Sequence, residues 1–191
     1  MAGIKGTKTE KNLLKSFAGE SQARNRYTYF ASVARKEGYI QVSNVFEETA
    51  DNEKEHAKRM FKFLEGGMVE ITASYPAGVL ATTPEHLKAA AEGENEEHTT
   101  LYPSFAKTAR EEGFPKVAEM YDAIGVAEKQ HEKRYRGLLA GIQTDKAFKK
   151  ASPVKWRCTN CGYIHEGNAV PETCPACLHP GKYFEVLAEN W

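Results

Sequence analysis

The chain has 191 residues, and its 26 Lys and Arg balance its 26 Asp and Glu, which gives a formal net charge of zero. This balance gives no reason to expect nucleic acid or an anionic membrane surface as a partner. No apolar run approaches the roughly 20 residues that a membrane-spanning helix needs, and residues 1–15 lack the continuous apolar region of a secretory signal. We therefore expect a cytoplasmic protein of one or two domains.

Capping residues mark two predicted helices in the first third of the chain. Thr7, followed three residues later by Glu10, resembles a capping box and predicts a helix that begins near residue 7 and ends at Gly38. A second predicted helix covers roughly residues 41–65 and ends at two consecutive glycines. These two helices would form the first half of a helical region.

Residues 66–83 are too long for a tight hairpin, so we interpret them as a crossover connection. Thr83 is expected to cap a third helix that ends at Gly113. Pro115 would open a fourth helix that ends near Gly141. The sequence therefore predicts a mainly α protein with a four-helix bundle and one long connection.

The motif Glu53-x-x-His56 in the second helix recurs as Glu128-x-x-His131 in the fourth. Residues three apart on a helix share a face, so each pair directs a carboxylate and an imidazole to one point. One such pair alone is usually a solvated charged face. Both pairs here lie in the apolar stripe of their helix, where an unpaired charge would be costly, and a metal would cancel the charge of both.

The two halves of the helical region repeat each other. Residues 30–38 match residues 105–113 with an offset of 75, and the same offset relates the two Glu-x-x-His motifs. Glu20 breaks this rule, because its counterpart Glu94 lies at an offset of 74. One extra residue in a helix is absorbed most easily as a π-bulge, which we predict within residues 94–103.

A Glu from each of two helices, combined with Glu-x-x-His from the other two, is the pattern of a dinuclear carboxylate site. Glu53 and Glu128 would bridge the two metals, and Glu20 and Glu94 would be terminal ligands. The π-bulge would bring Glu97 towards the metals, although a solvated Glu97 is the alternative. Mixed carboxylate and imidazole ligation suits iron or manganese. The predicted ligands are Glu20, Glu53, His56, Glu94, Glu97, Glu128 and His131.

Tyr27 and Tyr102 lie about two turns from Glu20 and Glu94 on the same helix faces. Their hydroxyls could donate hydrogen bonds to ligating carboxylates, or the two residues could simply be core aromatics. The remaining histidines have no partner at ligand spacing, and we interpret them as surface residues: His86, His98, His165 and His179.

Residues 143–153 are polar and rich in Lys, and we interpret them as a linker between a bundle unit, 1–146, and a small tail unit, 147–191. The tail contains too few apolar residues to fold without a stabilising cross-link such as a bound metal. Its small core would consist of Trp156, Tyr163 and Phe184.

All four cysteines of the chain lie in the tail as two Cys-x-x-Cys pairs: Cys158, Cys161, Cys174 and Cys177. This spacing indicates metal binding rather than a disulfide framework. Tetrahedral sulfur coordination fits zinc or iron. Considered by itself, such a motif more commonly binds zinc. A redox-capable dinuclear site in the same chain favours iron instead, because a thiolate-bound iron would supply electrons to that site.

Over its full length the chain resembles the rubrerythrin family. The duplicated Glu and Glu-x-x-His pattern resembles the ferritin-like di-iron domain of that family, and the added Glu97 resembles a feature that plain ferritins lack. Cys158-x-x-Cys161-Gly-Tyr163 and Cys174-Pro-x-Cys177 resemble its rubredoxin-like domain. One departure is Leu178, which follows the last cysteine where rubredoxins usually have Gly.

The resemblance implies a ferritin-like bundle, a rubredoxin-like tail and three irons per chain, two in the bundle and one held by the cysteines. It implies a peroxidase that reduces hydrogen peroxide to water and protects an anaerobe or microaerophile from oxidative stress. Electrons would come from NADH through a reductase or a separate rubredoxin, and pass from the thiolate-bound iron to the di-iron site. One iron would exchange His56 for Glu97 between redox states. The resemblance also implies a homodimer, or a higher even oligomer, in which the tail of one subunit approaches the di-iron site of the other.

Three other functions stay open at the level of sequence. A ferroxidase or iron-storage protein would explain the bundle but not the cysteines. A structural protein would hold zinc in its tail beside an inactive bundle site. An oxidase would use oxygen in place of peroxide.

Overall fold

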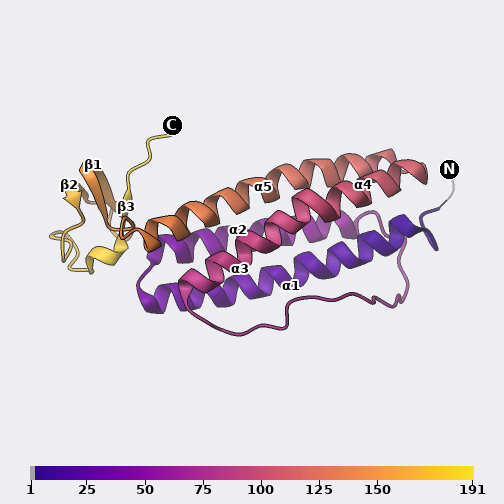
Figure 1. Cartoon of the computed structure of the whole chain (residues 1–191), viewed down its shortest axis with the longest axis horizontal. Coiled ribbons are helices and arrows are strands. Elements are labelled where there is room, and N and C mark those ends of the chain that lie inside the picture. The colour runs from indigo at the N-terminus through magenta and orange to yellow at the C-terminus, as the bar shows by residue number, and fades with distance from the viewer. Residues whose placement is uncertain (1–2) are drawn as a thin grey trace.

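The computed structural model describes residues 3–191, so Met1 and Ala2, with which the expected bundle unit begins, lie outside the described residues. Four long helical rods lie side by side, and a small three-stranded sheet follows at one end (Figure 1). The third rod consists of α3, a π-helical turn and α4. The helical elements are α1 (Lys8–Glu37), α2 (Ile40–Phe61), α3 (Thr83–Glu96), the π-helix (Glu97–Leu101), α4 (Tyr102–Glu111) and α5 (Pro115–Gln143). The predicted four-helix bundle is therefore confirmed.

Helix α1 has the ends that its sequence predicts. The side chain of Thr7 accepts a hydrogen bond from the backbone N–H of Glu10, at 3.0 Å. The Glu10 carboxylate reaches back to the N–H of Gly6 at 2.7 Å, one residue before the usual capping-box partner. Gly38 ends the helix with φ at 89°, a left-handed conformation that glycine adopts without the steric cost of a Cβ.

Two other helix ends differ from the prediction. Helix α2 stops at Phe61, because the N–H groups of Phe63 and Leu64 bind carbonyls only three residues back, those of Met60 and Phe61, and so close tight turns. Thr82, not Thr83, caps α3. The Glu85 carboxylate accepts hydrogen bonds from both the N–H and the hydroxyl of Thr82, and this contact fixes the cap one residue earlier.

The crossover connection between α2 and α3 runs along the outside of the bundle, as Figure 1 shows. Most of its residues are exposed, including Met68 and Val79, but hydrogen bonds attach its middle and its end to the helices. The Tyr75 hydroxyl donates to the backbone carbonyl of Lys15 at 2.5 Å. The N–H of Ala81 donates to Nε2 of His86 at 2.8 Å.

His86 is buried, so the prediction that it is a surface residue was wrong. Its ring stacks on Phe30 with 4.0 Å between the ring centroids, and its Nε2 accepts the hydrogen bond that ends the crossover. The other three histidines of that prediction, His98, His165 and His179, are half-buried. A neutral imidazole can pack as an aromatic ring while it satisfies a backbone group, and spacing along the sequence cannot reveal this.

The predicted π-bulge is confirmed: residues Glu97–Leu101 form a π-helical turn between α3 and α4. The extra residue lets Glu94 and Tyr102 occupy the same faces as Glu20 and Tyr27, although they are eight and not seven positions apart.

Two apolar clusters fill the bundle. One is centred on Tyr27, Phe30, Phe46, Leu87 and Tyr135. The other contains Leu13, Met60, Tyr102, Val117 and Tyr121. Fully burying a side chain of this size contributes about 1.5–3 kcal/mol. The buried glutamates and histidines of the bundle are thus held in place by apolar side chains that pack in these two clusters.

The tail is an antiparallel sheet with the strand order β2-β1-β3, formed by β1 (Lys149–Cys158), β2 (Ile164–Ala169) and β3 (Phe184–Val186). A short 3-10 turn, Gly181–Tyr183, precedes β3. Lys149 already pairs with Ala169, so the connection from α5 is shorter than the expected linker 143–153. Trp156 and Phe184 are buried as predicted, whereas Tyr163 is 37 % exposed and packs edge-on against Phe184.

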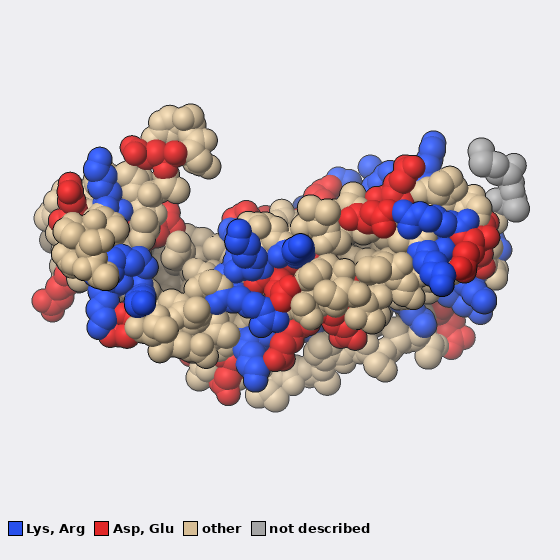
Figure 2. All heavy atoms as spheres, turned by 45° about the horizontal axis from the view of Figure 1, so that its top comes forward, with Lys and Arg blue, Asp and Glu red and all other residues tan. Residues whose placement is uncertain are grey.

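The tail lies at the end of the bundle where α1 turns into α2 (Figure 1). Tyr39 stacks on Phe148 with 6.0 Å between ring centroids, and Nζ of Lys182 donates to the carbonyl of Glu37 at 3.4 Å. Basic and acidic side chains alternate over the face shown in Figure 2, in keeping with the zero net charge. Within residues 3–191 no helix is both long and apolar enough to cross a bilayer.

Candidate metal centres

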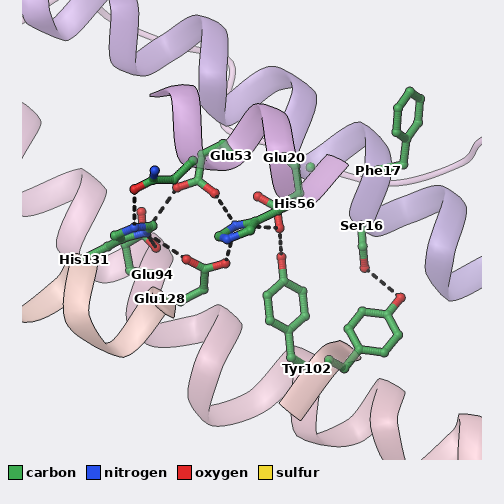
Figure 3. A network of polar contacts seen from close by, with 12 residues as sticks. Ser16, Phe17, Glu20, Glu53, His56, Glu94, Tyr102, Glu128 and His131 are labelled. Carbon is green, nitrogen blue, oxygen red and sulfur yellow. Dashed lines mark hydrogen bonds and ion pairs between the residues drawn. The ribbon is translucent and has the colours of Figure 1, made fainter. Parts of the chain in front are cut away.

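Six of the predicted ligands converge between the two apolar clusters of the bundle, and each rod contributes at least one (Figure 3). Their ligand atoms form two groups, each within 4.8 Å. One group comprises Glu20, Glu53, His56 and Glu128. The other comprises Glu53, Glu94, Glu128 and His131. Glu53 and Glu128 belong to both groups, as two bridging carboxylates would.

The two imidazoles present the same ring nitrogen to the carboxylates. Nδ1 of His56 lies 2.9 Å from Glu53 and 3.0 Å from Glu128. Nδ1 of His131 lies 2.8 Å from Glu128 and 3.3 Å from Glu53. Figure 3 shows the two shared glutamates on opposite sides of the space between the histidines. Both Nδ1 atoms therefore face the centre of the site, and both Nε2 atoms face away from it.

The carboxylates are almost completely buried, with exposed fractions of 0 or 1 %. A single Nδ1 carries at most one proton, so it cannot satisfy the carboxylates that surround it. Several oxygens accordingly lack a hydrogen-bond partner among the described residues: Oε2 of Glu20, Oε1 of Glu53, Oε2 of Glu94 and both oxygens of Glu128. Buried, unpaired carboxylate oxygens beside two imidazole nitrogens fit a pair of divalent cations. The residues present are thus suited to a dinuclear metal site.

The pKa values reflect the same crowding of buried carboxylates around two imidazoles. Burial, followed by the charge of Glu53, raises the pKa of Glu94 to about 8 and that of Glu20 well above its ordinary value. Burial alone would also raise the pKa of Glu53, but its close contacts with His131 and His56 outweigh it and lower that pKa to about 2. Burial would lower the histidine pKa values, yet the close contacts with Glu128 and Glu53 raise them to about 10 for His56 and about 12 for His131.

The two predicted tyrosines do reach carboxylates, but not those on their own helix. The Tyr27 hydroxyl of α1 donates to Glu94 of α3 at 2.6 Å. The Tyr102 hydroxyl of α4 donates to Glu20 of α1 at 2.5 Å. These crossed bonds tie the two halves of the repeat together, because each tyrosine spans from one half to the terminal glutamate of the other.

Glu97 does not join either group of ligand atoms. It is half-buried at the start of the π-helix and lines a cavity of about 310 Å³ together with Tyr75 and Tyr102. Burial, followed by the charge of Glu94, raises its pKa well above the ordinary value. Glu97 therefore lies beside the site, and its role as a ligand stays a prediction.

Spacing arguments missed two sets of polar residues around the site. Asn52 accepts a hydrogen bond from Nε2 of His131 at 3.2 Å. Glu132 accepts hydrogen bonds from His98 at 2.6 Å and from Asn95, which attaches the third rod to α5 beside the π-helix. Together with Arg136, these donors outweigh the effect of burial and lower the pKa of Glu132 to about 2. A mismatch in the internal repeat was the available signal for Asn52, since its counterpart is an alanine.

The four cysteines of the tail also converge, and all four are free thiols. The sulfurs of Cys158 and Cys177 are 3.8 Å apart, and those of Cys161 and Cys174 are 3.7 Å apart. A tetrahedron with metal–sulfur bonds of about 2.3 Å has edges of about 3.8 Å. The cysteines thus fit one tetrahedral metal ion.

Two similar turns hold the cysteine pairs. The N–H of Gly162 donates to the carbonyl of Cys158, and the N–H of Leu178 donates to that of Cys174, both at 2.9 Å. Gly162 has φ at 81° and Leu178 has φ at 60°. Leu178, which departs from the usual glycine, therefore occupies a left-handed conformation that costs a side-chain-bearing residue about 1–2 kcal/mol.

Comparisons with known proteins agree with both centres. A family model described as rubrerythrin matches residues 11–139. A second model, described as the rubredoxin-like domain of rubrerythrin, matches residues 156–185. The rubrerythrin of Nitratidesulfovibrio vulgaris is 54% identical over 191 residues, and rubrerythrin-1 of Clostridium acetobutylicum is 58% identical over 196 residues. In both cases the match covers 100% of this chain and 100% of the relative.

Solved structures share the architecture. Fully reduced, all-ferrous nigerythrin is 30% identical with a TM-score of 0.64, and the match covers 97% of this chain and 92% of that chain. A bacterioferritin of Mycobacterium tuberculosis is 17% identical with a TM-score of 0.62, over 71% of this chain and 86% of that one. The latter likeness shows the fold alone. The bundle is ferritin-like, and the tail is rubredoxin-like.

Proposed function

Because the chain belongs to the rubrerythrin family, we propose that it is a non-haem di-iron peroxidase that reduces hydrogen peroxide to water. Its bundle holds a ferritin-like di-iron site with carboxylate and histidine ligands, and its tail holds a rubredoxin-like four-cysteine site. The observation that carries the proposal is the pair of buried ligand groups that share two glutamates, in a chain that also contains four converging thiols. When bound, a ferrous pair supplies the two electrons that cleavage of an O–O bond requires.

The ligand roles follow from the two groups. Glu53 and Glu128 would bridge both metals, because both groups contain them. Glu20 and His56 would complete one metal position, and Glu94 and His131 would complete the other. Glu97 would be a further ligand in place of His56 when the iron is ferric, since a carboxylate neutralises ferric iron better and an imidazole suits ferrous iron.

Other side chains hold these ligands and admit the substrate. Tyr27 and Tyr102 donate to the terminal glutamates and so fix their orientation. The cavity lined by Glu97 and Tyr102 has room for hydrogen peroxide, and Tyr102 connects it to the site through its hydrogen bond to Glu20. The conversion of hydrogen peroxide to two water molecules consumes two protons. The raised pKa of Glu97 suits its carboxyl group to hold one of them.

The position of the tail supports a homodimer or a higher even oligomer. The tail contacts α1 at Glu37, and the 17 residues from Glu20 to Glu37 extend roughly 25 Å along a helix. Electron transfer through protein falls steeply with distance, so the tail of the same chain is a poor donor. A partner subunit placed head to tail would bring its own cysteine site to this di-iron site.

We further propose a bundle unit, 1–146, and a tail unit, 147–191, that work as electron acceptor and donor, with iron in the tail. Cys161 is exposed, so the tail iron is accessible to an external donor. That donor is a rubredoxin or an NADH-dependent reductase. The protein acts in the cytoplasm, where such donors keep it reduced and where it limits oxidative stress in an anaerobe or microaerophile.

Anaerobic peroxide consumption by the iron-loaded protein, with an excess of reductant, tests the proposal. Glu53→Ala removes a bridging ligand and should abolish turnover while the red colour of the thiolate-bound iron persists. Glu55→Ala is the matched control, because Glu55 is exposed on the same helix and, among residues 3–191, pairs with Lys58 alone. Equal activity of the two variants would contradict the proposal. Oxidation of added ferrous ions by oxygen, without any peroxide consumption, would indicate a ferroxidase instead.

A further inference from the structure

One polar contact breaks the internal repeat at the metal site. Asn52, four residues before His56 in α2, accepts a hydrogen bond from Nε2 of His131 at 3.2 Å. The equivalent position in α5, four residues before His131, is Ala127. Alanine offers no side-chain acceptor, and no group within residues 3–191 accepts a hydrogen bond from Nε2 of His56. The two imidazoles are therefore held differently, although their ligand-bearing helices are copies of each other.

The difference matters because of how each ring faces the site. Both histidines turn Nδ1 towards the carboxylates. An imidazole that binds a metal through Nδ1 carries its proton on Nε2, and an acceptor for that proton fixes the ring and raises its basicity. His131 has this acceptor in Asn52, whereas the side chain of His56 is 15 % exposed against 5 % for His131.

Apart from Glu97, which the proposed function adds at the His56 position, the glutamates do not distinguish the two metal positions. Glu53 and Glu128 are common to both. Each terminal glutamate receives one tyrosine hydroxyl, at 2.5 Å for Glu20 and 2.6 Å for Glu94. Within the two groups of converging residues, the support of the histidine is thus the contact in which the two positions differ.

We propose that Asn52 is a positioning residue that fixes His131, and that Ala127 leaves His56 unsupported, so that the two metal positions differ in lability. The metal held by Glu94 and His131 leaves slowly, and the metal held by Glu20 and His56 leaves first. This inference rests on the ligand assignment of the proposed function.

Release of cobalt(II) tests the inference. The metal-free full-length protein is loaded with cobalt, and transfer to an excess of chelator is followed by absorbance, in which the thiolate-bound cobalt of the tail has its own bands. The bundle of the unmodified protein should lose its two ions in two phases. Asn52→Ala should accelerate the slow phase about 10- to 100-fold and leave the fast phase unchanged. Asn52→Asp retains an acceptor oxygen and should preserve the slow phase.

Ala127→Asn is the mirror experiment, since it offers His56 the acceptor that it lacks. Ala127 is half-buried, so the larger side chain has access to solvent. This variant should slow the fast phase, and the double variant Asn52→Ala/Ala127→Asn should exchange the order in which the positions empty. Equal acceleration of both phases by Asn52→Ala would show a general structural effect and would overturn the inference.

A second readout requires no metal. With ¹⁵N-labelled histidine, the Nε2 proton of His131 should exchange slowly with solvent and that of His56 rapidly. Asn52→Ala should make the two equally rapid, and Asn52→Asp should keep the protection. A single release phase, or no change in proton exchange, would overturn this inference and leave the proposed function intact. Fewer than two cobalt ions bound by the unmodified bundle would overturn the ligand assignment itself.

Discussion

Single hydroxyl groups connect the two halves of the bundle at the metal site. Tyr27 and Tyr102 were singled out by their spacing from Glu20 and Glu94, but each one donates to the glutamate of the opposite half. The sequence shows that these residues lie on inward faces, and it does not show which partner across the bundle each will meet. Residue type and face were predictable here, whereas the pairing depends on how the helices pack.

Loss of the Tyr102 hydroxyl should impair the metal site more than the fold. Tyr102→Phe removes the hydrogen bond to Glu20, so we expect peroxidase activity or metal affinity to fall about 10- to 100-fold. Tyr121→Phe is the matched control, because the Tyr121 hydroxyl contacts Ser16 at 3.1 Å and no ligand. Each variant should lose about 1 kcal/mol of unfolding free energy, measured by denaturant titration. Equal activity losses in both variants would show that only general stability is at stake.

The metal-free protein should become less stable as the pH rises from about 7 to 10. His56 and His131 have folded-state pKa values of about 10 and about 12, above the unfolded value of about 6.5. Their contribution is complete below the unfolded pKa and is lost as the pH rises through the folded values, because the folded state then binds more protons than the unfolded state. Glu94, with a pKa of about 8, acts in the same direction.

Thermal melting of the metal-free protein at a series of pH values checks this expectation, with the metal-loaded protein as the control. Metal binding displaces protons from the ligands, so the loaded protein should lose the decline and gain affinity for metal as the pH rises. A melting temperature of the metal-free protein that increased between pH 7 and 10 would contradict the charge assignment of the two histidines.

At the scale of elements, local signals predicted most boundaries, and contacts outside the helix explain the misses. The one-residue mismatch between the two halves predicted the π-helix at Glu97–Leu101, since an insertion leaves a trace in the sequence. The cap of α3 depends on which threonine Glu85 binds, and two adjacent threonines are not separable by pattern. His86 was misjudged because its partners, Phe30 and Ala81, come from the first helix and the crossover.

The two cysteine turns of the tail provide a paired prediction at this scale. Gly162 and Leu178 occupy equivalent left-handed positions, at φ values of 81° and 60°. Gly162→Leu should destabilise the tail by about 1–2 kcal/mol, because the new Cβ crowds the backbone. Leu178→Gly relieves the same strain and should cost nothing or stabilise slightly. Thermal loss of the red thiolate–iron colour measures both, and a destabilising Leu178→Gly would show that side-chain packing outweighs the backbone strain.

At the scale of the whole molecule, the four-helix architecture and both metal centres were accessible from the sequence because the ligand motifs are duplicated. The position of the tail was not accessible, since a short connection allows many placements. It lies at the end of the bundle, attached near Glu37 and Tyr39, remote from the buried carboxylates. Under the proposed function, electrons therefore reach the di-iron site from the tail of a partner subunit.

Stopped-flow mixing of the fully reduced, iron-loaded protein with hydrogen peroxide tests this account most directly. The absorbance of the thiolate-bound iron reports oxidation of the tail, and oxygen serves as the comparison oxidant. We predict that peroxide reoxidises the tail rapidly and faster than oxygen does, and that Glu53→Ala abolishes this reaction while the red centre stays intact. A tail that remains reduced after peroxide, or that responds no faster to peroxide than to oxygen, would contradict the account.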